Sequence, residues 1–196
     1  SNANRMVGTA FTPNPFSSSG NAPIYVSTNG GTTWFLCFNV PSNGDFGTGD
    51  ITVSGTSAPS KLYGGILKTP GSHLLNILKA DDFINCSPLN VLSSRSEIDQ
   101  PFVHAVTLGG NDRVYLGSND FNAADGKTAT IDVSLNGGAT FRTVRLEPRS
   151  TGGAQQNGPS IRTATANDGT VYAAYFGWRS FLNNTAFSDI VVVRDD

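Results

Sequence analysis

An eight-residue motif that occurs twice constrains this chain more than any other feature. Residues 27–34 read Ser-Thr-Asn-Gly-Gly-Thr-Thr-Trp, and residues 134–141 read Ser-Leu-Asn-Gly-Gly-Ala-Thr-Phe. A β-rich run lies before and after each copy. Asn-Gly between two such runs is the strongest short signal for a hairpin, because the turn needs positive φ at both central residues. Each copy therefore predicts a β-hairpin.

The spacing of the copies indicates a longer repeat. Their opening serines are 107 positions apart, about twice a plausible repeat length. Two weaker copies complete the series, at residues 74–82 and residues 189–196. With Lys79 and Arg194 as the equivalents of the serines, the spacings become 52, 55 and 60. A period near 50 with four strands per unit is typical of a β-propeller blade.

A second recurring block supports the same organisation. A strand that begins at or near proline is followed by a turn and then by a Val-Tyr or Leu-Tyr strand. The instances are residues 99–103 with 113–117, residues 158–161 with 170–175 and, more weakly, residues 50–53 with 61–65. Proline at the start of a strand avoids the loss of a ladder hydrogen bond. We expect Tyr115, Tyr172 and Tyr175, which lie in these runs, to be core residues.

These patterns predict an all-β fold, a partial β-propeller of four-stranded antiparallel blades. The 22 Gly and 10 Pro disfavour long helices, while 38% hydrophobic residues are enough to build a core. Residues 1–3 resemble what remains of a cleaved expression tag, and residues 4–196 form one propeller segment. Within it we expect a half blade at 22–40, blades at 50–93 and 99–146, and an incomplete blade at 159–194. The ring is therefore incomplete, and its expected partners are the remaining blades or a second copy of the chain.

Charge and motif content exclude several classes of protein. The chain has 13 Lys and Arg against 15 Asp and Glu, a net charge of −2, which argues against nucleic-acid binding. No run of about 18 apolar residues is present, so no membrane span is expected. Neither a serine–histidine–acid arrangement nor a nucleotide-binding glycine loop is visible. Cys37 and Cys86 could pair if the protein is secreted, but a free thiol fits both positions equally well.

The two strong copies resemble the Asp-box, or BNR repeat, of sialidase-like propellers, written S-x-D-x-G-x-T-W. Asn29 and Asn136 stand at the usual aspartate, and Phe141 replaces one tryptophan. The resemblance implies that the motif stabilises a turn on the face away from the active site. The structural residues of the two copies are Ser27, Asn29, Gly31, Trp34, Ser134, Asn136, Gly138 and Phe141.

The opposite face would then carry the binding loops, because loops carry binding residues more often than core strands do. The ligand-binding candidates on that face are Arg95, Asp99, Asp120, Trp178 and Arg179. An aromatic ring and a fork-shaped donor suit a sugar or a carboxylate. Other interpretations stay open: Asp99 caps the strand that follows it, and Trp178 covers a blade edge.

We expect no cofactor and no metal site. The spacing of Asp120 and Asp125 loosely suggests calcium, but the run lacks the ligand pattern of a known calcium loop and fits an ordinary polar loop as well.

The sialidase resemblance implies a glycan-recognising bacterial protein that is secreted or located at the cell surface or in the periplasm. Sialoside hydrolysis is expected only in the complete ring. Residues 5–7, Arg-Met-Val, match the family's Arg-Ile-Pro motif poorly, and no Tyr/Glu catalytic pair can be assigned, so no catalytic residue is predicted. The alternatives are a non-catalytic propeller that binds proteins and a structural module of a larger surface protein.

Overall fold

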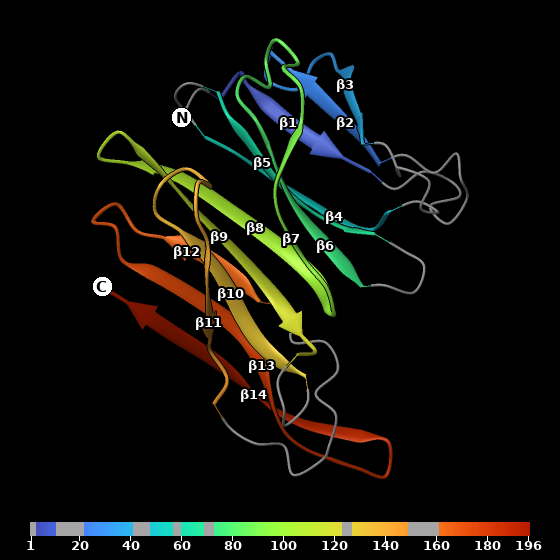
Figure 1. The fold of residues 1–196 in the computed structure, drawn as a ribbon, viewed down its shortest axis with the longest axis vertical. Helices are drawn as coiled ribbons and strands as arrows, with labels where there is room; N and C mark the ends of the chain where they lie inside the picture. Colours follow the sequence, from blue (N-terminus) through green and yellow to red (C-terminus); the bar gives the residue numbers. More distant parts are fainter. Residues whose placement is uncertain are drawn as a thin grey trace.

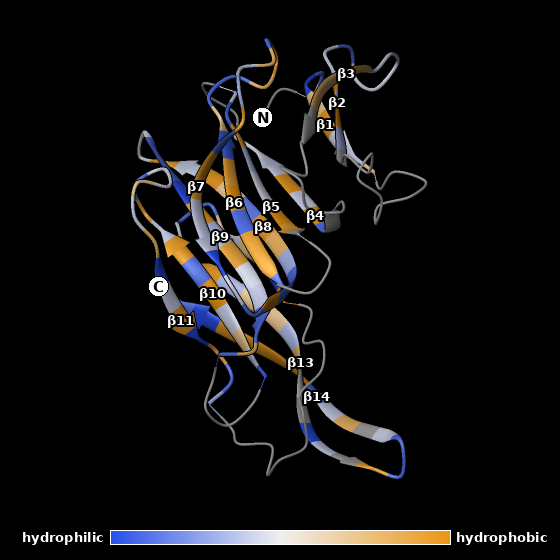
Figure 2. Cartoon of the chain, turned by 45° about the vertical axis from the view of Figure 1, so that its right-hand side comes forward, coloured by the Kyte–Doolittle hydropathy of each residue, from blue (hydrophilic) through white to orange (hydrophobic). Residues whose placement is uncertain are grey.

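The computed structural model describes residues 3–10, 22–40, 48–56, 60–68, 73–122, 127–148 and 161–196. This part of the chain is all-β and contains no helix, so no helix there could span a membrane. Apolar and polar residues alternate along β10 (Figure 2). Such alternation places one set of side chains on each face of a strand.

The strands form four antiparallel sheets, which follow one another in chain order from top to bottom of Figure 1. Sheet 1 contains β1 (Met6–Thr9), β2 (Ala22–Ser27) and β3 (Phe35–Val40). Sheet 2 contains β4 (Thr48–Gly55), β5 (Leu62–Lys68), β6 (Leu74–Ala80) and β7 (Asn90–Arg95). Sheet 3 contains β8 (Ile98–Leu108), β9 (Asn111–Asp120), β10 (Thr128–Ser134) and β11 (Arg142–Arg145). Sheet 4 contains β12 (Arg162–Thr165), β13 (Val171–Leu182) and β14 (Thr185–Asp195). These sheets are consecutive blades of a partial β-propeller, which confirms the predicted fold class.

Sheet 1 contains a strand that the sequence did not indicate. β1 pairs antiparallel with β2, with Met6 opposite Ser27 and Thr9 opposite Ile24. β1 has only four residues, and Gly8 interrupts its apolar pattern, so it carries little period-2 signal. Sheet 1 therefore has three strands where residues 22–40 alone predicted two.

Each pair of neighbouring sheets encloses its own apolar core. Ile24 and Val26 of sheet 1 pack with residues of sheet 2 such as Leu62. The core between sheets 2 and 3 includes Tyr63, Leu75, Ile77, Ile98, Val114 and Leu116. The core between sheets 3 and 4 includes Tyr115, Ala129, Ile131, Ile161, Ala173 and Tyr175. Burial of apolar area in these layers is the main favourable term that holds successive sheets together.

Tyr172 departs from the prediction that it lies in the core, because its side chain is 39% exposed. It faces away from sheet 3, whereas Tyr175, three residues later on the other face of β13, is buried. The equivalent tyrosines of sheets 2 and 3, Tyr63 and Tyr115, are buried because a following sheet covers them. Alternation predicts two faces but does not say which of them is covered.

The two Ser-x-Asn-Gly-Gly turns, at residues 27–34 and 134–141, have matching hydrogen bonds. In the first, the Ser27 hydroxyl donates to Asn29 Oδ1 at 3.0 Å and accepts the N–H of Gly31 at 2.9 Å. In the second, the bonds from Ser134 to Asn136 Oδ1 and from Gly138 N to Ser134 Oγ are both 2.9 Å. Each Asn carboxamide also bonds the threonine four residues later, Thr33 or Thr140.

Glycine is required in these turns because Gly31 and Gly138 have φ of 86° and 87°. The turns are therefore the same local structure, formed twice.

The aromatic residues that end the two turns pack differently. Phe141 joins the core between sheets 2 and 3. Trp34 instead lies over Gly8 of its own sheet, is 44% exposed, and donates its indole N–H to the carbonyl of Gly31 at 3.0 Å. The difference arises because Phe141 faces sheet 2, whereas Trp34 lies on the face of sheet 1 that no described sheet covers.

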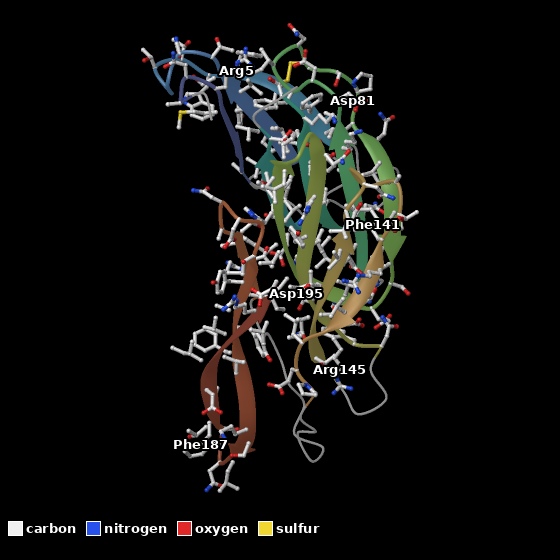
Figure 3. The ribbon with its side chains drawn as sticks, turned by 90° about the vertical axis from the view of Figure 1, so that its left-hand side faces the viewer. Arg5, Asp81, Phe141, Arg145, Phe187 and Asp195 are labelled. Atoms are coloured by element: carbon white, nitrogen blue, oxygen red, sulfur yellow. A yellow bond between two sulfur atoms is a disulfide. The ribbon has the colours of Figure 1, made fainter. Side chains whose placement is uncertain are left out.

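A disulfide joins sheets 1 and 2. Cys37 in β3 is bonded to Cys86, which lies between β6 and β7, with a Cα–Cα distance of 5.3 Å (Figure 3, yellow bond near the top). The structure therefore decides between the two states that the sequence left open. The bond closes a loop across 49 positions and so restrains the unfolded chain.

Candidate functional site

The first strands of sheets 2, 3 and 4, which are β4, β8 and β12, lie side by side. We call the edge that they form the inner edge of the molecule. The Ser54 hydroxyl of β4 accepts the N–H of Ala105 in β8 at 2.9 Å. On the other side of β8, His104 Nε2 lies 3.1 Å from the hydroxyl of Thr165 in β12. Side chains from three different sheets can therefore reach one common space at this edge.

A cleft of about 440 Å³ opens at one end of these strands. Its lining comes from β4 (Asp50, Ile51, Thr52), from β8 (Gln100, Pro101, Phe102) and from β12 (Arg162). A volume of this size is typical of small-molecule sites, which combine apolar walls with a few placed polar groups. We therefore treat this cleft, named here the inner-edge cleft, as the candidate functional site.

The β8 backbone is irregular where it enters the cleft. The pairing of β8 with β9 shifts register between Asp99 and Phe102, and Gln100 adopts a φ of 51°. The Asp99 carboxylate accepts the N–H of Gln100 at 2.9 Å and so stabilises this conformation. Non-glycine residues with positive φ are uncommon and cluster at functional sites. The bulge turns Gln100 and Phe102 toward the cleft.

Gln100 Oε1 is buried and has no hydrogen-bond partner in the described part of the chain. Both polar atoms of the Asn119 carboxamide are also buried without a partner among the described residues. Asn119 lies opposite Asp99 in the β8–β9 register. Buried polar groups are normally hydrogen-bonded, so each such exception needs an explanation, such as strain, a functional role or a bridging water. Of the two residues, Gln100 lines the cleft, and its acceptor is therefore unused hydrogen-bonding capacity there.

Arg162 is the cation of the cleft lining. Its guanidinium carbon lies 4.4 Å from the centre of the Phe102 ring, a cation–π contact. One terminal nitrogen also donates to the carbonyl of Ile161 at 3.2 Å. These contacts hold the planar group in place, and a planar guanidinium is suited to fork-shaped hydrogen bonding with carboxylates or paired hydroxyls.

Asp50 is the carboxyl group with a perturbed pKa in this cleft. Burial raises its pKa, because the charged form loses solvation, and the negative charge of Asp99 raises it further. Asp50 thus keeps its proton to higher pH than an ordinary aspartate, and the charge of Asp99 contributes to this effect.

Arg95 and Asp120, two of the sequence-predicted candidates, are brought together outside this cleft. Arg95, at the end of β7, forms ion pairs with Asp120 of β9 and with Asp132 of β10, whose Oδ1 and Oδ2 lie 2.8 and 2.6 Å from Arg95 Nη1. Burial opposes the charge on Arg95, but the two carboxylates outweigh it and raise its pKa. The Thr143 hydroxyl also donates to Asp132 at 2.6 Å. This network, named here the Arg95 cluster, ties sheet 2 to sheet 3.

Arg179 and Trp178 lie on the long β13–β14 hairpin, which projects from the sheets and carries Phe187 near its tip (Figure 3). Arg179 is 65% exposed and lies 3.4 Å from Asp189. Trp178 is at a register shift of this hairpin, and its side chain falls outside the described part of the structure. Of the five candidates, Asp99 is the one next to the inner-edge cleft: it precedes the lining residue Gln100 and its charge acts on Asp50, but it is not itself part of the lining.

No group of three or more His, Cys, Asp or Glu residues that could hold a metal ion occurs in the described ranges. Asp125, part of the loosely calcium-like run, lies outside the described residues. Asp120 has an arginine partner and accepts the N–H of Asn122 at 2.9 Å.

Sequence reasoning missed Asp50, Gln100, Phe102 and Arg162. A signal was present for Asp50, since the block at residues 50–53 was the weak counterpart of residues 99–103, which include Asp99. Equivalent positions of successive blades lie close together at the inner edge. The equivalence of Asp50 and Asp99 in the two blocks therefore indicated that their carboxylates are neighbours. No comparable signal marked Arg162. The equivalent block before it, residues 158–161, reads Gly-Pro-Ser-Ile and contains no charged residue.

No protein-family model and no curated protein sequence matches this chain. Among solved structures it resembles an α-L-arabinofuranosidase of Fusarium graminearum, determined as the E242A mutant with an iminosugar inhibitor. That likeness has a TM-score of 0.63 at 14% identity and covers 97% of this chain and 59% of that one. The arabinobiose complex of the GH93 enzyme from the same organism gives a TM-score of 0.61 at 14% identity, with 97% and 58% covered. This chain thus spans less than two thirds of the chains it matches, and at this identity the likeness shows a shared fold: this chain has the architecture of the glycoside-hydrolase β-propellers.

Proposed function

We propose that this protein recognises a glycan in the inner-edge cleft. The observation that carries the proposal is the convergence of Asp50, Gln100, Phe102 and Arg162 from three sheets on one cleft of about 440 Å³. Asp50, Thr52, Gln100 and Arg162 offer acceptors and donors for hydroxyl groups, while Ile51, Pro101 and Phe102 offer apolar walls. The orphaned Gln100 acceptor supports the same interpretation.

If the complete ring is catalytic, Asp50 is the proton donor that we propose for glycoside hydrolysis. Its raised pKa keeps it protonated to higher pH, as a general acid requires, and Asp99 supplies the second carboxylate. Glycosidases generally use such a pair on either side of the scissile bond.

Sialoside recognition is the more specific form of the proposed glycan binding; its hydrolysis would need a tyrosine nucleophile in place of the second carboxylate. The matching hydrogen bonds of the turns at residues 27–34 and 134–141 support their interpretation as Asp-boxes. Arg162 is the cleft residue suited to a substrate carboxylate. A neutral pentose glycan is the competing substrate, since a structural neighbour was solved with arabinobiose.

Calorimetric titration of this chain with sialyllactose and with arabinobiose tests the proposal. We expect one of the two sugars to bind, and Arg162→Ala and Asp50→Asn each to weaken binding about tenfold, the effect of one charged hydrogen bond. Arg179→Ala is the matched control, because Arg179 is exposed and lies outside the cleft lining. Absence of binding to both sugars, or an equal loss in the control, would overturn the proposal.

We also propose an extracytoplasmic location. The Cys37–Cys86 bond supports it, because structural disulfides persist in secreted, cell-surface and periplasmic proteins and are rare in the cytosol.

The proposed partners at the ends of the sheet series are the remaining propeller blades or a second copy. The face of sheet 4 that points away from sheet 3 supports this proposal. It exposes Tyr172, Phe176, Ile190 and Val192, which are between 39% and 77% exposed. Equivalent faces of sheets 2 and 3 are covered by the next sheet.

A further inference from the structure

The first strands of sheets 2 and 3 are both irregular where they reach the inner-edge cleft. The pairing of β4 with β5 shifts register between Thr48 and Ile51, a stretch that contains Asp50. The pairing of β8 with β9 shifts in the same way around Gln100. A β-bulge adds an unpaired residue to one strand and changes the direction of a side chain. Each of the two bulges thus contributes a polar residue to the cleft lining, Asp50 from sheet 2 and Gln100 from sheet 3.

The backbone of Gln100 is strained. Its φ is 51°, although it lies inside the strand β8 and is followed by Pro101. The residue before a proline favours an extended backbone, because the proline ring crowds the other conformations. A side chain at positive φ also brings its Cβ close to the following carbonyl oxygen. Both effects oppose the conformation that Gln100 adopts.

Other non-glycine residues with positive φ have a clear structural reason for it. Asn183 and Asn184 form the two-residue turn of the β13–β14 hairpin, a turn that needs positive φ at both positions. At Ser60, the hydroxyl accepts a hydrogen bond from Arg5 Nη1 at 2.7 Å. The side-chain oxygen of Gln100, in contrast, is buried without a partner in the described part of the chain. Strain that no internal contact of the side chain explains is typical of ligand-binding positions.

Asp99 holds the Gln100 bulge in place. Its Oδ1 accepts the N–H of Gln100 at 2.9 Å, and Asp99 itself is not part of the cleft lining. Asp99 therefore acts on the cleft in two ways, through this hydrogen bond and through the effect of its charge on Asp50. The hydrogen bond needs only an acceptor oxygen, whereas the effect on Asp50 needs the negative charge. Asparagine at position 99 would keep the first and remove the second.

We propose that Asp99 is a positioning residue for Gln100, and that Gln100 Oε1 accepts a hydrogen bond from one hydroxyl group of the bound sugar. This inference rests on the proposed glycan recognition and adds the group that selects among sugars. The strained bulge keeps the acceptor in place before the sugar arrives, so that less conformational freedom is lost on binding. A site built to bind a particular hydroxyl rejects analogues that lack it, because its own polar group is then left unpaired.

The variants Gln100→Ala and Gln100→Gly test the strain and the acceptor together. Both remove Oε1, so both should weaken the sugar that binds, sialyllactose or arabinobiose, about tenfold in calorimetric titration. Only glycine relieves the positive φ, so we expect a higher urea midpoint for Gln100→Gly than for Gln100→Ala. Val91, a 56% exposed residue of β7 without positive φ, is the matched control. There the glycine variant should be the less stable one, because glycine loses more conformational freedom on folding.

The variants Asp99→Ala and Asp99→Asn test the positioning role. Asp99→Ala should weaken the sugar and speed hydrogen exchange of the Gln100 amide, each about tenfold, the effect of one hydrogen bond. Asp99→Asn keeps an acceptor oxygen and should stay within about twofold of wild type in both measurements. Asp168→Ala is the matched control, because the Asp168 carboxylate also accepts a backbone N–H, that of Thr170 at 2.9 Å, outside the cleft. It should leave sugar affinity unchanged, and thermal unfolding checks that all variants fold.

Two results obtained without sugar would overturn the inference. One is a urea midpoint of Gln100→Ala equal to or above that of Gln100→Gly, and the other is unchanged exchange of the Gln100 amide in Asp99→Ala. Equal loss of sugar binding in Asp99→Asn and Asp99→Ala would also overturn it, because the charge would then be the cause. Failure of both sugars to bind wild type overturns the proposed function and the recognition role of Gln100 with it. The two measurements without sugar still report in that case whether Asp99 holds the strained bulge, so the two failures are distinguishable.

Discussion

Asp50 is the residue through which the inner-edge cleft should respond to pH. Its raised pKa means that the folded protein binds this proton more tightly than the unfolded chain, whose aspartates titrate near 3.8. The resulting stabilisation is present in full below pH 3.8 and is lost as the pH rises through the raised pKa. We therefore expect wild type to lose stability, relative to Asp50→Asn, as the pH increases from about 4 to 7. Urea midpoints of both proteins across this range measure the effect, and parallel curves would contradict it.

Gly117 shows how closely successive sheets approach. A Cβ at this position would lie 2.7 Å from Ile161 Cγ2 and 3.2 Å from the Ile161 carbonyl oxygen. We expect Gly117→Ala to lower the free energy of unfolding by about 1–3 kcal/mol through overpacking. Ala174, the equivalent position in sheet 4, lies on the face that no described sheet covers, so Ala174→Val should be nearly neutral. Equal effects of the two substitutions in urea unfolding would show that sheet contact is not the cause.

At the residue scale, sequence reasoning singled out one residue next to the candidate site, Asp99, and none of the residues that line it. Asp99 was found because it opens a recognisable repeat block. Arg95 and Asp120 were predicted as ligand-binding candidates, and in the structure they form an ion pair with each other across a sheet boundary. No local pattern encodes that pairing, since the two residues are brought together only by the packing of sheet 2 on sheet 3.

At the scale of the elements, the Arg95 cluster joins the last strand of sheet 2 to the middle strands of sheet 3. Arg95→Met would leave Asp132, whose side chain is 1% exposed, without its cation. We expect a loss of about 2–4 kcal/mol in the free energy of unfolding, since an unpaired buried charge is costly. Arg179→Met removes an exposed pair and should cost less than about 0.5 kcal/mol. Similar losses in the two variants would contradict a structural role for the cluster.

The disulfide acts between sheets 1 and 2 in a comparable way. The double variant Cys37→Ser/Cys86→Ser should lose about 2–4 kcal/mol of stability, because its unfolded chain is no longer cross-linked. Hydrogen exchange should show the loss of protection first in sheet 1, because sheet 2 is the described sheet with which sheet 1 shares a core. Unchanged stability, or loss beginning in sheet 4, would contradict this account.

The positions of the strands were easier to predict from the sequence than the surfaces that pack against them. The Asn-Gly turns predicted two hairpins, and the period near 50 predicted how strands group into sheets, because both signals are local or repetitive. β1 was missed because four residues carry too little alternation. The different packing of Phe141 and Trp34 could not be predicted either, since it depends on which face of a sheet has a neighbour.

At the scale of the whole molecule, the four sheets form a series in which each inner interface buries one apolar core. The inner edge brings the first strands of three sheets together at the candidate site. Residues far apart in the sequence thus meet there only because successive sheets pack on one another.

An NMR titration of the uniformly ¹⁵N-labelled chain with arabinobiose and with sialyllactose tests the central claim most directly. We predict that one of these sugars shifts the amide signals of residues 50–52, 100–102 and 162, and that Arg162→Ala reduces these shifts at the same subsaturating sugar concentration. The β14 amides should stay unchanged. Absence of shifts with both sugars, or shifts confined to the β13–β14 hairpin around Arg179, would contradict the claim that the inner-edge cleft is the glycan site.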